Sequence, residues 1–442
     1  ENDWEWDFSR IWNNIKIGIQ KAFAEYPEIA AIGIDTWGVD YGMIGFDGKL
    51  LRNPVSYRSL RTKGIETEVY RVISQARLYQ ETGIQYLHFN TLYQLKKDAS
   101  LLKKTDKILL MPDLIAYYLT GTMRMELTNL STTNLYNLHT RSMIDLENIG
   151  IPKRVFPDMI YPEEAYGLIK KDLASELSIP RVPVIAVCTH DTASAVFSIP
   201  DEDDYIYISS GTWSLCGVLL DKPVTTLHAR EENYTNEIGY GHQTRFLKNV
   251  MGLWIINQCL EEWHHQRNNI SYAQIASCAE KAEYAGFIDP DAPLFESPGA
   301  MVGRIKEYCR NTGQREPQTI GEIALTIYQS LAYKYRFVFE TLEMILGRNY
   351  KKIVIVSGGS NISLLNQLTA SVCAKTVSTG AQEATILGNA LVLMKATKTI
   401  KTLAEGRDLI RKSISEKIYL SEDKMNLDAE YRRFCRIIKG VI

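Results

Sequence analysis

The sequence predicts an α/β protein built from two large domains. A chain of 442 residues exceeds the roughly 100–200 residues of a typical single domain. Two buried-strand patterns, Val182–Cys188 and Ile353–Val356, each lead through a short polar turn into a helical pattern. The charged turn PDEDD at 200–204 separates these two units, so we expect one domain over 1–200 and another over 201–442.

The composition is that of an ordinary globular protein. Hydrophobic residues make up 45%, charged residues 23%, and the net charge is −2, which indicates neither a nucleic-acid nor a membrane partner. No apolar run reaches the ~18–20 residues of a membrane span, and no signal peptide is visible. The seven scattered cysteines form no CxxC pair, which favours free thiols in a reducing cytoplasm over a metal cage. We expect a cytoplasmic protein that acts on small molecules, as a monomer or a dimer.

The start of the chain predicts a helix followed by a β-hairpin. Between Trp4 and Tyr26 apolar residues recur at four-residue spacing, as in an amphipathic helix. Ile29–Ile34 is predicted as a strand, the chain turns through DTWGVD at 35–40, and Tyr41–Phe46 returns as a second strand. Asp47-Gly48 is then a strong signal for a further tight turn.

The DTWGVD turn carries two carboxylates, an indole and a glycine, which is unusual chemistry for a plain hairpin. Gly38 would allow a ligand close to the backbone, and Trp37 would offer its apolar face to a sugar. The alternative is an aromatic corner flanked by surface acids. Further on, Arg58 and Arg61 would share one face of a helix and could hold a polar ligand, or could simply be solvated.

The remainder of the first domain predicts helices over 66–79 and 109–120, the second closed by Gly121. It ends with Thr189-His190-Asp191, between the strand Val182–Cys188 and a helix of small residues over 192–197. Open α/β sheets place their chemistry at the carboxyl ends of strands, which favours a catalytic Asp191. Aspartate is also a preferred helix N-cap, so the junction could be no more than a cap.

The second domain opens with a strand, the turn Ser209–Ser214 and a returning strand. Backbone N–H groups and hydroxyls in such a turn can cradle a phosphate, although a tight polar hairpin would have the same sequence. Asn249 is predicted at the head of a helix that runs to Trp263. Helices are expected over 271–287 and 320–346.

A second glycine turn, Ser357 to Asn361, lies between the strand Ile353–Val356 and a helix over 363–373. Bare backbone at Gly358 and Gly359 would let a nucleotide approach, although the turn lacks the lysine and the spacing of a Walker A motif. A close-packed helix rich in small residues begins near Glu383.

Six segments in a fixed order resemble the FGGY family of carbohydrate kinases over essentially the whole chain: GIDTWGVDYG, GIQYLHFNTLYQL, LLMPDLIAYYLTG, THDTASAV, YISSGTWSLCG and LKNVMGLW. The resemblance implies a two-domain actin-like ATPase (ribonuclease H-like) fold with the active site in the interdomain cleft. It also implies a kinase that uses ATP and Mg²⁺. The members most similar to this chain convert L-rhamnulose to L-rhamnulose 1-phosphate in L-rhamnose catabolism. The alternatives are another ketose, such as L-fuculose or L-xylulose, or a sugar- or nucleotide-binding protein without catalysis.

The resemblance assigns roles to individual positions. It makes Asp191 the catalytic base that accepts the proton of the sugar's terminal hydroxyl. A helix dipole favours the ionised form, so we expect a weak base, which suffices if the proton moves late. The remaining candidate residues fall into two sets. Those expected at the sugar are Gly38, His190 and Thr192 from the resemblance, together with Trp37 and Arg58 from the chemistry of their side chains. Those expected at the nucleotide are Thr212, Asn249, Gly358, Gly359 and Asn257, the last standing where glutamine is usual.

The sequence also departs from the family pattern. The family opens with a strand, an Asp-Gly-rich phosphate loop and a returning strand, just before the Trp-Asp pair that matches Trp6-Asp7, and this unit is absent here. We expect a truncated chain, with the first phosphate loop and the metal ligand in the missing part, so no metal ligand is assigned. Ser59 stands where an acid is usual, and Ser357 where a third glycine is usual.

Overall fold

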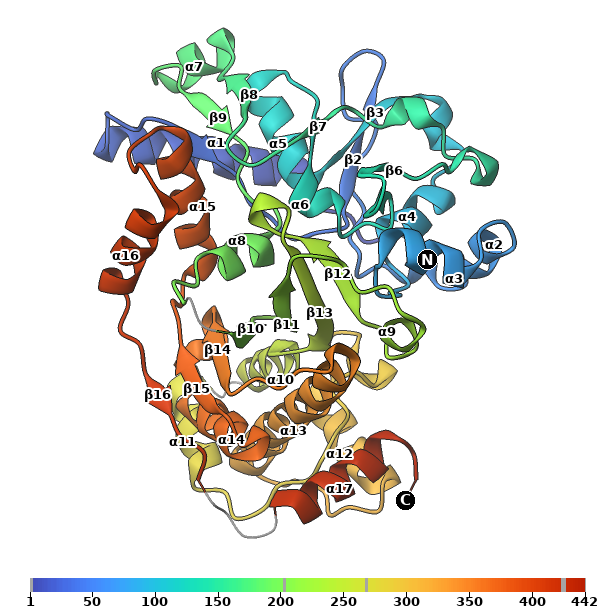
Figure 1. The fold of residues 1–442 in the computed structure, drawn as a ribbon, viewed down its shortest axis with the longest axis vertical. Coiled ribbons are helices and arrows are strands. Elements are labelled where there is room, and N and C mark those ends of the chain that lie inside the picture. The colour runs from blue at the N-terminus through green and yellow to red at the C-terminus, as the bar shows by residue number, and fades with distance from the viewer. Residues whose placement is uncertain (1–2, 202–203, 267–268, 423–426, 442) are drawn as a thin grey trace. The chain divides into compact units, whose positions relative to one another are not determined.

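The computed structural model describes residues 3–201, 204–266, 269–422 and 427–441 (Figure 1). The chain folds into two compact units. The first unit comprises Glu1–Pro200, Leu219–Phe246 and Thr385–Lys412, and the second comprises Asp201–Val218, Leu247–Ala384 and Ser413–Ile442. The chain therefore leaves the first unit after Pro200 and returns to it twice.

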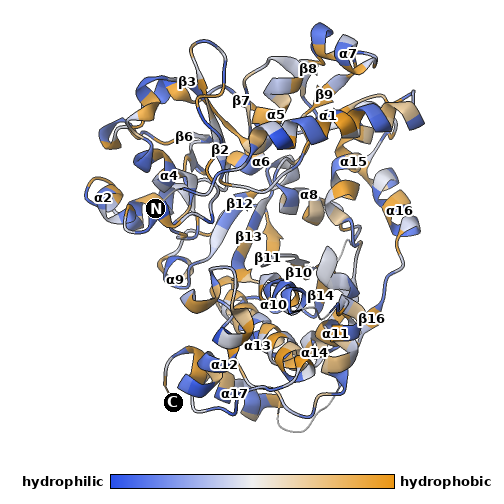
Figure 2. Cartoon of the chain, turned by 180° about the vertical axis from the view of Figure 1, so that it is seen from behind, coloured by the Kyte–Doolittle hydropathy of each residue, from blue (hydrophilic) through white to orange (hydrophobic). Residues whose placement is uncertain are grey.

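The first unit begins with helix α1 (Phe8–Glu25), where Asp7 caps the N-terminus by accepting a hydrogen bond from the Arg10 N–H at 3.0 Å. Polar and apolar residues both occur along α1, as the predicted amphipathic helix requires (Figure 2). Strand β1 (Ile32–Gly33) pairs in parallel with β9 (Pro183–Ile185), which pairs antiparallel with β8 (Ala165–Leu168). This small sheet carries Asp191 beyond the end of β9.

The predicted hairpin through residues 35–40 is wrong. Strand β2 (Tyr41–Gly45) pairs with β3 (Thr105–Leu110), so β1 and β2 belong to different sheets. The connection cannot close as a tight turn, because Asp40 is fully buried and accepts hydrogen bonds from two indoles. The turn at Asp47-Gly48 does form, since the Gly45 N–H donates to the Lys49 carbonyl at 2.8 Å.

The predicted helix over 66–79 is two helices, α2 (Glu66–Tyr70) and α3 (Gln75–Thr82), because Ser74 caps a new N-terminus. Helix α5 (Met111–Thr120) ends at Gly121, which has φ 82°, as predicted. The other helices of this unit are α4 (Thr91–Lys97), α6 (Leu127–Leu130), α7 (Lys171–Leu177), α8 (Asp191–Phe197), α9 (Leu227–Glu231), α15 (Ala384–Ala396) and α16 (Leu403–Ser413). Its other strands are β4 (Met125–Glu126), β5 (Tyr136–Asn137), β6 (Ser142–Met143), β7 (Met159–Ile160) and β12 (Thr235–Ile238).

The second unit is built on a sheet in the order β13-β11-β10-β14-β15-β16. These strands are β10 (Tyr205–Ser210), β11 (Trp213–Leu220), β13 (Thr244–Met251), β14 (Lys352–Val356), β15 (Thr376–Thr379) and β16 (Ile418–Tyr419). The helices are α10 (Trp254–His265), α11 (Tyr272–Glu280), α12 (Met301–Asn311), α13 (Ile320–Leu346), α14 (Ser363–Cys373) and α17 (Leu427–Ile438). The strand–turn–helix unit predicted around Gly358 is therefore present as β14 and α14.

Two helix predictions in this unit are corrected. Asn249 lies in strand β13, and α10 begins only at Trp254. Helix α11 ends at Glu280, because side chains of α13 hold the chain beyond it in an extended path. The Thr326 and Ser330 hydroxyls accept the N–H groups of Gly286 and Ile288 at 3.0 and 2.9 Å.

None of the helices in the described part of the chain is long and apolar enough to cross a membrane. The cysteines, all within described residues, are free thiols.

Candidate active site

Two segments far apart in the sequence meet in the first unit. The Thr36 N–H donates to the Thr189 carbonyl at 2.9 Å, and the Asp191 N–H donates to the Thr36 carbonyl at 3.0 Å. Thr36 and His190 thereby form a parallel β-bridge. The DTWGVD segment and the Thr189-His190-Asp191 junction, predicted separately from the sequence, are thus parts of one site.

Asp191 is the first residue of α8, and His190 occupies the N-cap position. Its carboxylate Oδ1 accepts hydrogen bonds from the Thr192 N–H at 2.5 Å and the Thr192 hydroxyl at 3.2 Å. The side chain keeps 46% of its surface exposed. Asp191 is therefore not the helix cap, and its carboxylate is open on one side.

The expectation that the helix dipole dominates Asp191 is wrong. Burial raises the pKa of this carboxyl to about 6; the hydrogen bonds from Thr192 lower it, and the nearby Asp35 carboxylate raises it. Desolvation is therefore the largest influence on the pKa of this carboxyl group. Asp191 is consequently a stronger base than its position in the sequence suggests.

His190 lies beside Asp191 with its Nε2 atom 3.5 Å from Asp191 Oδ1. Its Nδ1 atom lies 3.1 Å from Arg245 Nη2. Burial and the positive charge of Arg245 lower the pKa of His190 well below its usual value, so the imidazole is neutral near pH 7. A Cβ atom at Gly38 would lie 3.5 Å from His190 Nε2 and 3.1 Å from Thr132 Oγ1, so glycine keeps this face of the imidazole accessible.

The Trp37 side chain takes part in an aromatic corner. Its indole N–H donates to Asp40 Oδ2 at 2.9 Å, the Trp6 N–H donates to the same atom at 2.8 Å, and the two indole rings lie 4.5 Å apart. Asp40 is fully buried, so the alternative of surface acids is wrong for this residue. Burial raises its pKa to about 6.

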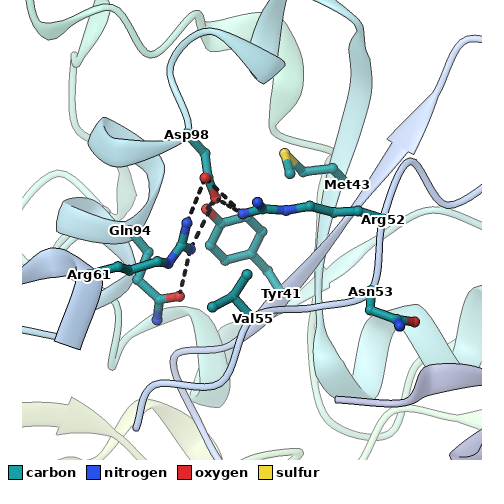
Figure 3. Close-up of a pocket in the computed structure, with 8 residues that line it drawn as sticks. All are labelled: Tyr41, Met43, Arg52, Asn53, Val55, Arg61, Gln94 and Asp98. Carbon is teal, nitrogen blue, oxygen red and sulfur yellow. Dashed lines mark hydrogen bonds and ion pairs between the residues drawn. The ribbon is translucent and has the colours of Figure 1, made fainter. Parts of the chain in front are cut away.

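The two predicted arginines do not act together. Arg61 belongs to the 3₁₀-helix η1 (Leu60–Thr62), whereas Arg58 precedes that helix and lies over the Tyr57 ring at 5.1 Å. Arg61 is held by Asp98 at 2.6 Å. Figure 3 shows the pocket that Arg61 and Asp98 line. Arg52 binds Asp98 from the other side, and the Tyr41 hydroxyl also donates a hydrogen bond to Asp98. The space is filled by its own ion pairs, so Arg61 is structural.

Two turns of the second unit present backbone where phosphate binding was predicted. The carbonyls of Gly211 and Thr212 accept N–H groups from Leu253 and from Gly252 and Trp254, at 2.9–3.2 Å, which fixes the turn between β10 and β11. The 3₁₀-helix η7 (Gly358–Asn361) packs on the end of β10. A Cβ atom at Gly359 would lie 2.0 Å from Ser210 Oγ, so only glycine fits there.

The predicted amide contacts have different settings. Asn249 lies half-buried in β13. Asn257 lies in α10, where its Oδ1 atom accepts a hydrogen bond from the Tyr272 hydroxyl of α11 at 3.0 Å. The Asn257 oxygen therefore ties two helices together.

Sequence reasoning missed Glu126. This fully buried carboxylate accepts the Thr189 hydroxyl at 2.6 Å, the Thr189 N–H at 3.2 Å and the Thr128 hydroxyl at 2.6 Å, and it caps α6. It thereby holds the residue two positions before Asp191. The sequence offers no separate signal for this contact, because Thr189 is 63 positions away.

Sequence reasoning also missed Arg245 and the contacts of α15. Asn389 Nδ2 donates to Asp35 Oδ2 at 2.7 Å, and the Thr385 hydroxyl donates to the Asp191 carbonyl at 3.2 Å.

No group of three or more His, Cys, Asp or Glu side chains that could hold a metal ion occurs within the described ranges.

Both halves of the chain match models of one protein family. Residues 1–198 match the N-terminal domain of the FGGY family of carbohydrate kinases, and residues 206–397 match its C-terminal domain. A rhamnulokinase of Ligilactobacillus salivarius (strain UCC118) is 40% identical over 98% of this chain and 90% of its own length. A rhamnulokinase of Bacillus subtilis (strain 168) is 39% identical over 95% of this chain and 87% of its own length.

Solved structures share the fold at low identity. A ligand-bound xylulose kinase of Lactobacillus acidophilus gives a TM-score of 0.77 at 16% identity, covering 99% of this chain and 90% of that one. A glycerol kinase of Plasmodium falciparum with ADP gives 0.75 at 15% identity, covering 98% and 88%. The actin-like two-domain α/β fold predicted from the sequence is confirmed. The chain belongs to the FGGY family of carbohydrate kinases, and it is a sugar kinase.

Proposed function

We propose that this kinase phosphorylates L-rhamnulose at its terminal hydroxyl with ATP, forming L-rhamnulose 1-phosphate, with Asp191 as the general base. The observation that carries the proposal is the half-exposed Asp191 carboxylate at the end of β9, beside His190 and bridged to the DTWGVD segment. The substrate follows from relatives named rhamnulokinase at 37–40% identity over nearly the whole chain.

Asp191 suits this role because its pKa of about 6 leaves it ionised near neutral pH and able to take a proton. Phosphoryl transfer passes through a loose transition state with little bond formation to the nucleophile. The base therefore removes the hydroxyl proton late, and most of the acceleration comes from positioning and charge neutralisation. The Thr192 hydrogen bonds hold the carboxylate in one orientation for this step.

The remaining sugar contacts are proposed at Gly38, His190, Thr192, Trp37 and Arg58. Gly38 leaves room beside the imidazole, and Thr192 lies one residue beyond the base. Arg58 is a half-buried residue whose guanidinium lies over the Tyr57 ring at 5.1 Å.

ATP is proposed to bind the second unit at Thr212, Asn249, Asn257, Gly358 and Gly359. Three N–H donors fix the Gly211-Thr212 turn. Gly359 packs on Ser210, whereas a Cβ atom at Gly358 would meet only the Ser210 carbonyl oxygen, at 3.9 Å, so space for a ligand remains beside Gly358. Mg²⁺ would enter with the phosphates and neutralise their charge, since it is commonly held by one or two carboxylates plus substrate oxygens.

A coupled assay of ADP release tests the proposal with a panel of L-rhamnulose, L-fuculose and L-xylulose, each with ATP. We expect the highest kcat/KM for L-rhamnulose, and phosphorus NMR of the product to show phosphate on O1. A higher kcat/KM for L-fuculose or L-xylulose would assign the chain to a different ketose. ADP release without any sugar dependence would overturn the kinase assignment itself.

A further inference from the structure

Arg245 is a buried cation that touches the proposed sugar-binding histidine. It lies in β13 with a fully buried side chain. Its Nη2 atom lies 2.9 Å from Glu237 Oε2 on β12 and 3.1 Å from His190 Nδ1. Its Nη1 atom is buried and has no hydrogen-bond partner among the residues that the structure describes. Desolvating a guanidinium costs free energy, so a buried arginine in contact with an imidazole suggests that the contact has a function.

The chemistry of the contact fixes where the histidine proton sits. A guanidinium only donates hydrogen bonds and does not lose its proton in proteins. The atom facing it, His190 Nδ1, must therefore accept. A neutral imidazole that accepts at Nδ1 carries its proton on Nε2. That Nε2 atom is the one 3.5 Å from Asp191 Oδ1, on the edge of the ring that faces Gly38.

We propose that Arg245, held by Glu237, is a positioning residue that fixes the tautomer of His190, so that Nε2–H is offered to a substrate oxygen next to the hydroxyl that Asp191 deprotonates. This inference rests on the proposed function for the identity of the substrate. In a 2-ketose phosphorylated at O1, the neighbouring oxygen is the one on C2. In the open-chain ketose this oxygen is a carbonyl, which only accepts a hydrogen bond and therefore requires an imidazole that donates.

The surroundings of His190 make the arrangement dependent on Arg245. Glu237 Oε2 lies 3.7 Å from His190 Nδ1 and, if Arg245 were absent, would favour a protonated Nδ1 by accepting a hydrogen bond from it. On its own helix, Asp191 faces Nε2. The backbone N–H of His190 donates to Thr128 Oγ1 at 3.3 Å, so it is not a hydrogen-bond partner of the imidazole ring. Removing Arg245 should therefore move the proton to Nδ1 or leave both nitrogens protonated.

Nitrogen NMR of histidine-labelled full-length protein reads the tautomer directly, with the His190→Gln spectrum assigning the signal. We expect an unprotonated Nδ1 and a protonated Nε2 in the unmutated protein. In Arg245→Met, Nδ1 should become protonated, and kcat/KM for L-rhamnulose should fall by roughly 10–100-fold, the range for losing a partner that orients a functional histidine. Arg245→Lys keeps a donor and should restore the Nε2–H tautomer and most of the activity.

Two further variants guard the result. The double variant Arg245→Met with Glu237→Gln removes both buried charges. We expect it to fold even if Arg245→Met does not. Because Arg245 no longer donates to His190 Nδ1, this atom should no longer be held unprotonated. Arg77→Met, on an exposed arginine paired with Glu81, should change neither spectrum nor kinetics. A protonated Nδ1 in the unmutated protein, or an unchanged tautomer in a less active Arg245→Met, would overturn the proposal. Activity toward another ketose without activity toward L-rhamnulose would count against the proposed substrate and leave the NMR result decisive for Arg245.

Discussion

Gly388 in α15 lies so close to Ser194 in α8 that a Cβ atom there would be 1.9 Å from the Ser194 carbonyl oxygen. The two helices therefore touch through their backbones. Helix α8 begins with Asp191, whose carbonyl also accepts the Thr385 hydroxyl of α15 at 3.2 Å. A segment nearly 200 positions downstream thus sets the position of the proposed base.

We predict that Gly388→Ala lowers both stability and activity. Alanine favours a helix, but the added methyl group must push α8 away, and overpacking of this kind costs about 1–3 kcal/mol. The matched control is Gly18→Ala in α1, where no atom lies within 4 Å of the new Cβ and a gain of roughly 0.5–1 kcal/mol is expected. Urea unfolding and kcat measure both variants. A Gly388→Ala protein as stable as the unmutated one would contradict this prediction, because it would show that α8 can move away from α15 without loss of stability.

Ser357 adopts φ 69° and ψ −164°, a region that essentially only glycine occupies without strain. We predict that Ser357→Gly stabilises the protein by about 1 kcal/mol, because relief of roughly 1–3 kcal/mol of strain exceeds the entropic cost of glycine. Ser357→Ala removes the same hydroxyl and keeps the Cβ atom, so it should not stabilise. Equal gains in the two variants in urea titrations would place the effect in the hydroxyl.

The acidic limb of the activity profile should report Asp191. The carboxylate must be ionised to accept a proton, so kcat/KM is expected to fall as the pH drops through about 6. Asp35→Asn removes a negative charge that raises the pKa of Asp191, so the limb should move to lower pH. Asp172→Asn, an exposed acid of α7, is the control and should leave the limb in place. A limb that does not respond to Asp35→Asn would belong to another group.

Local patterns in the sequence predicted the strand–turn–helix units well. The strand before Asp191, the turn between β10 and β11, and the helix after Gly359 are all present, because each depends on residues a few positions apart. The hairpin at 35–40 was mispredicted because burial of Asp40 depends on Trp6, 34 positions away. The sequence leaves the role of Arg61 open for the same reason, since its partner Asp98 lies far along the chain.

The pKa of Asp191 could not be predicted from the sequence either, because it depends on burial by residues that are distant along the chain. From the sequence, its place at a helix start suggested a lowered pKa, whereas in the fold the desolvation of the carboxyl group dominates. Neither Glu126 nor Arg245 stands near Asp191 in the sequence, and their roles follow only from the folded contacts.

The role of Asp191 is tested most directly by the kcat of Asp191→Asn with L-rhamnulose and ATP, alongside calorimetric binding of the sugar. Asparagine keeps the size of the side chain and an oxygen that can accept the Thr192 hydrogen bonds, and it loses the base. We predict that kcat falls by about 10²–10⁴-fold, while L-rhamnulose still binds. A loss of less than ~10-fold in kcat would contradict the assignment of Asp191 as the proton acceptor.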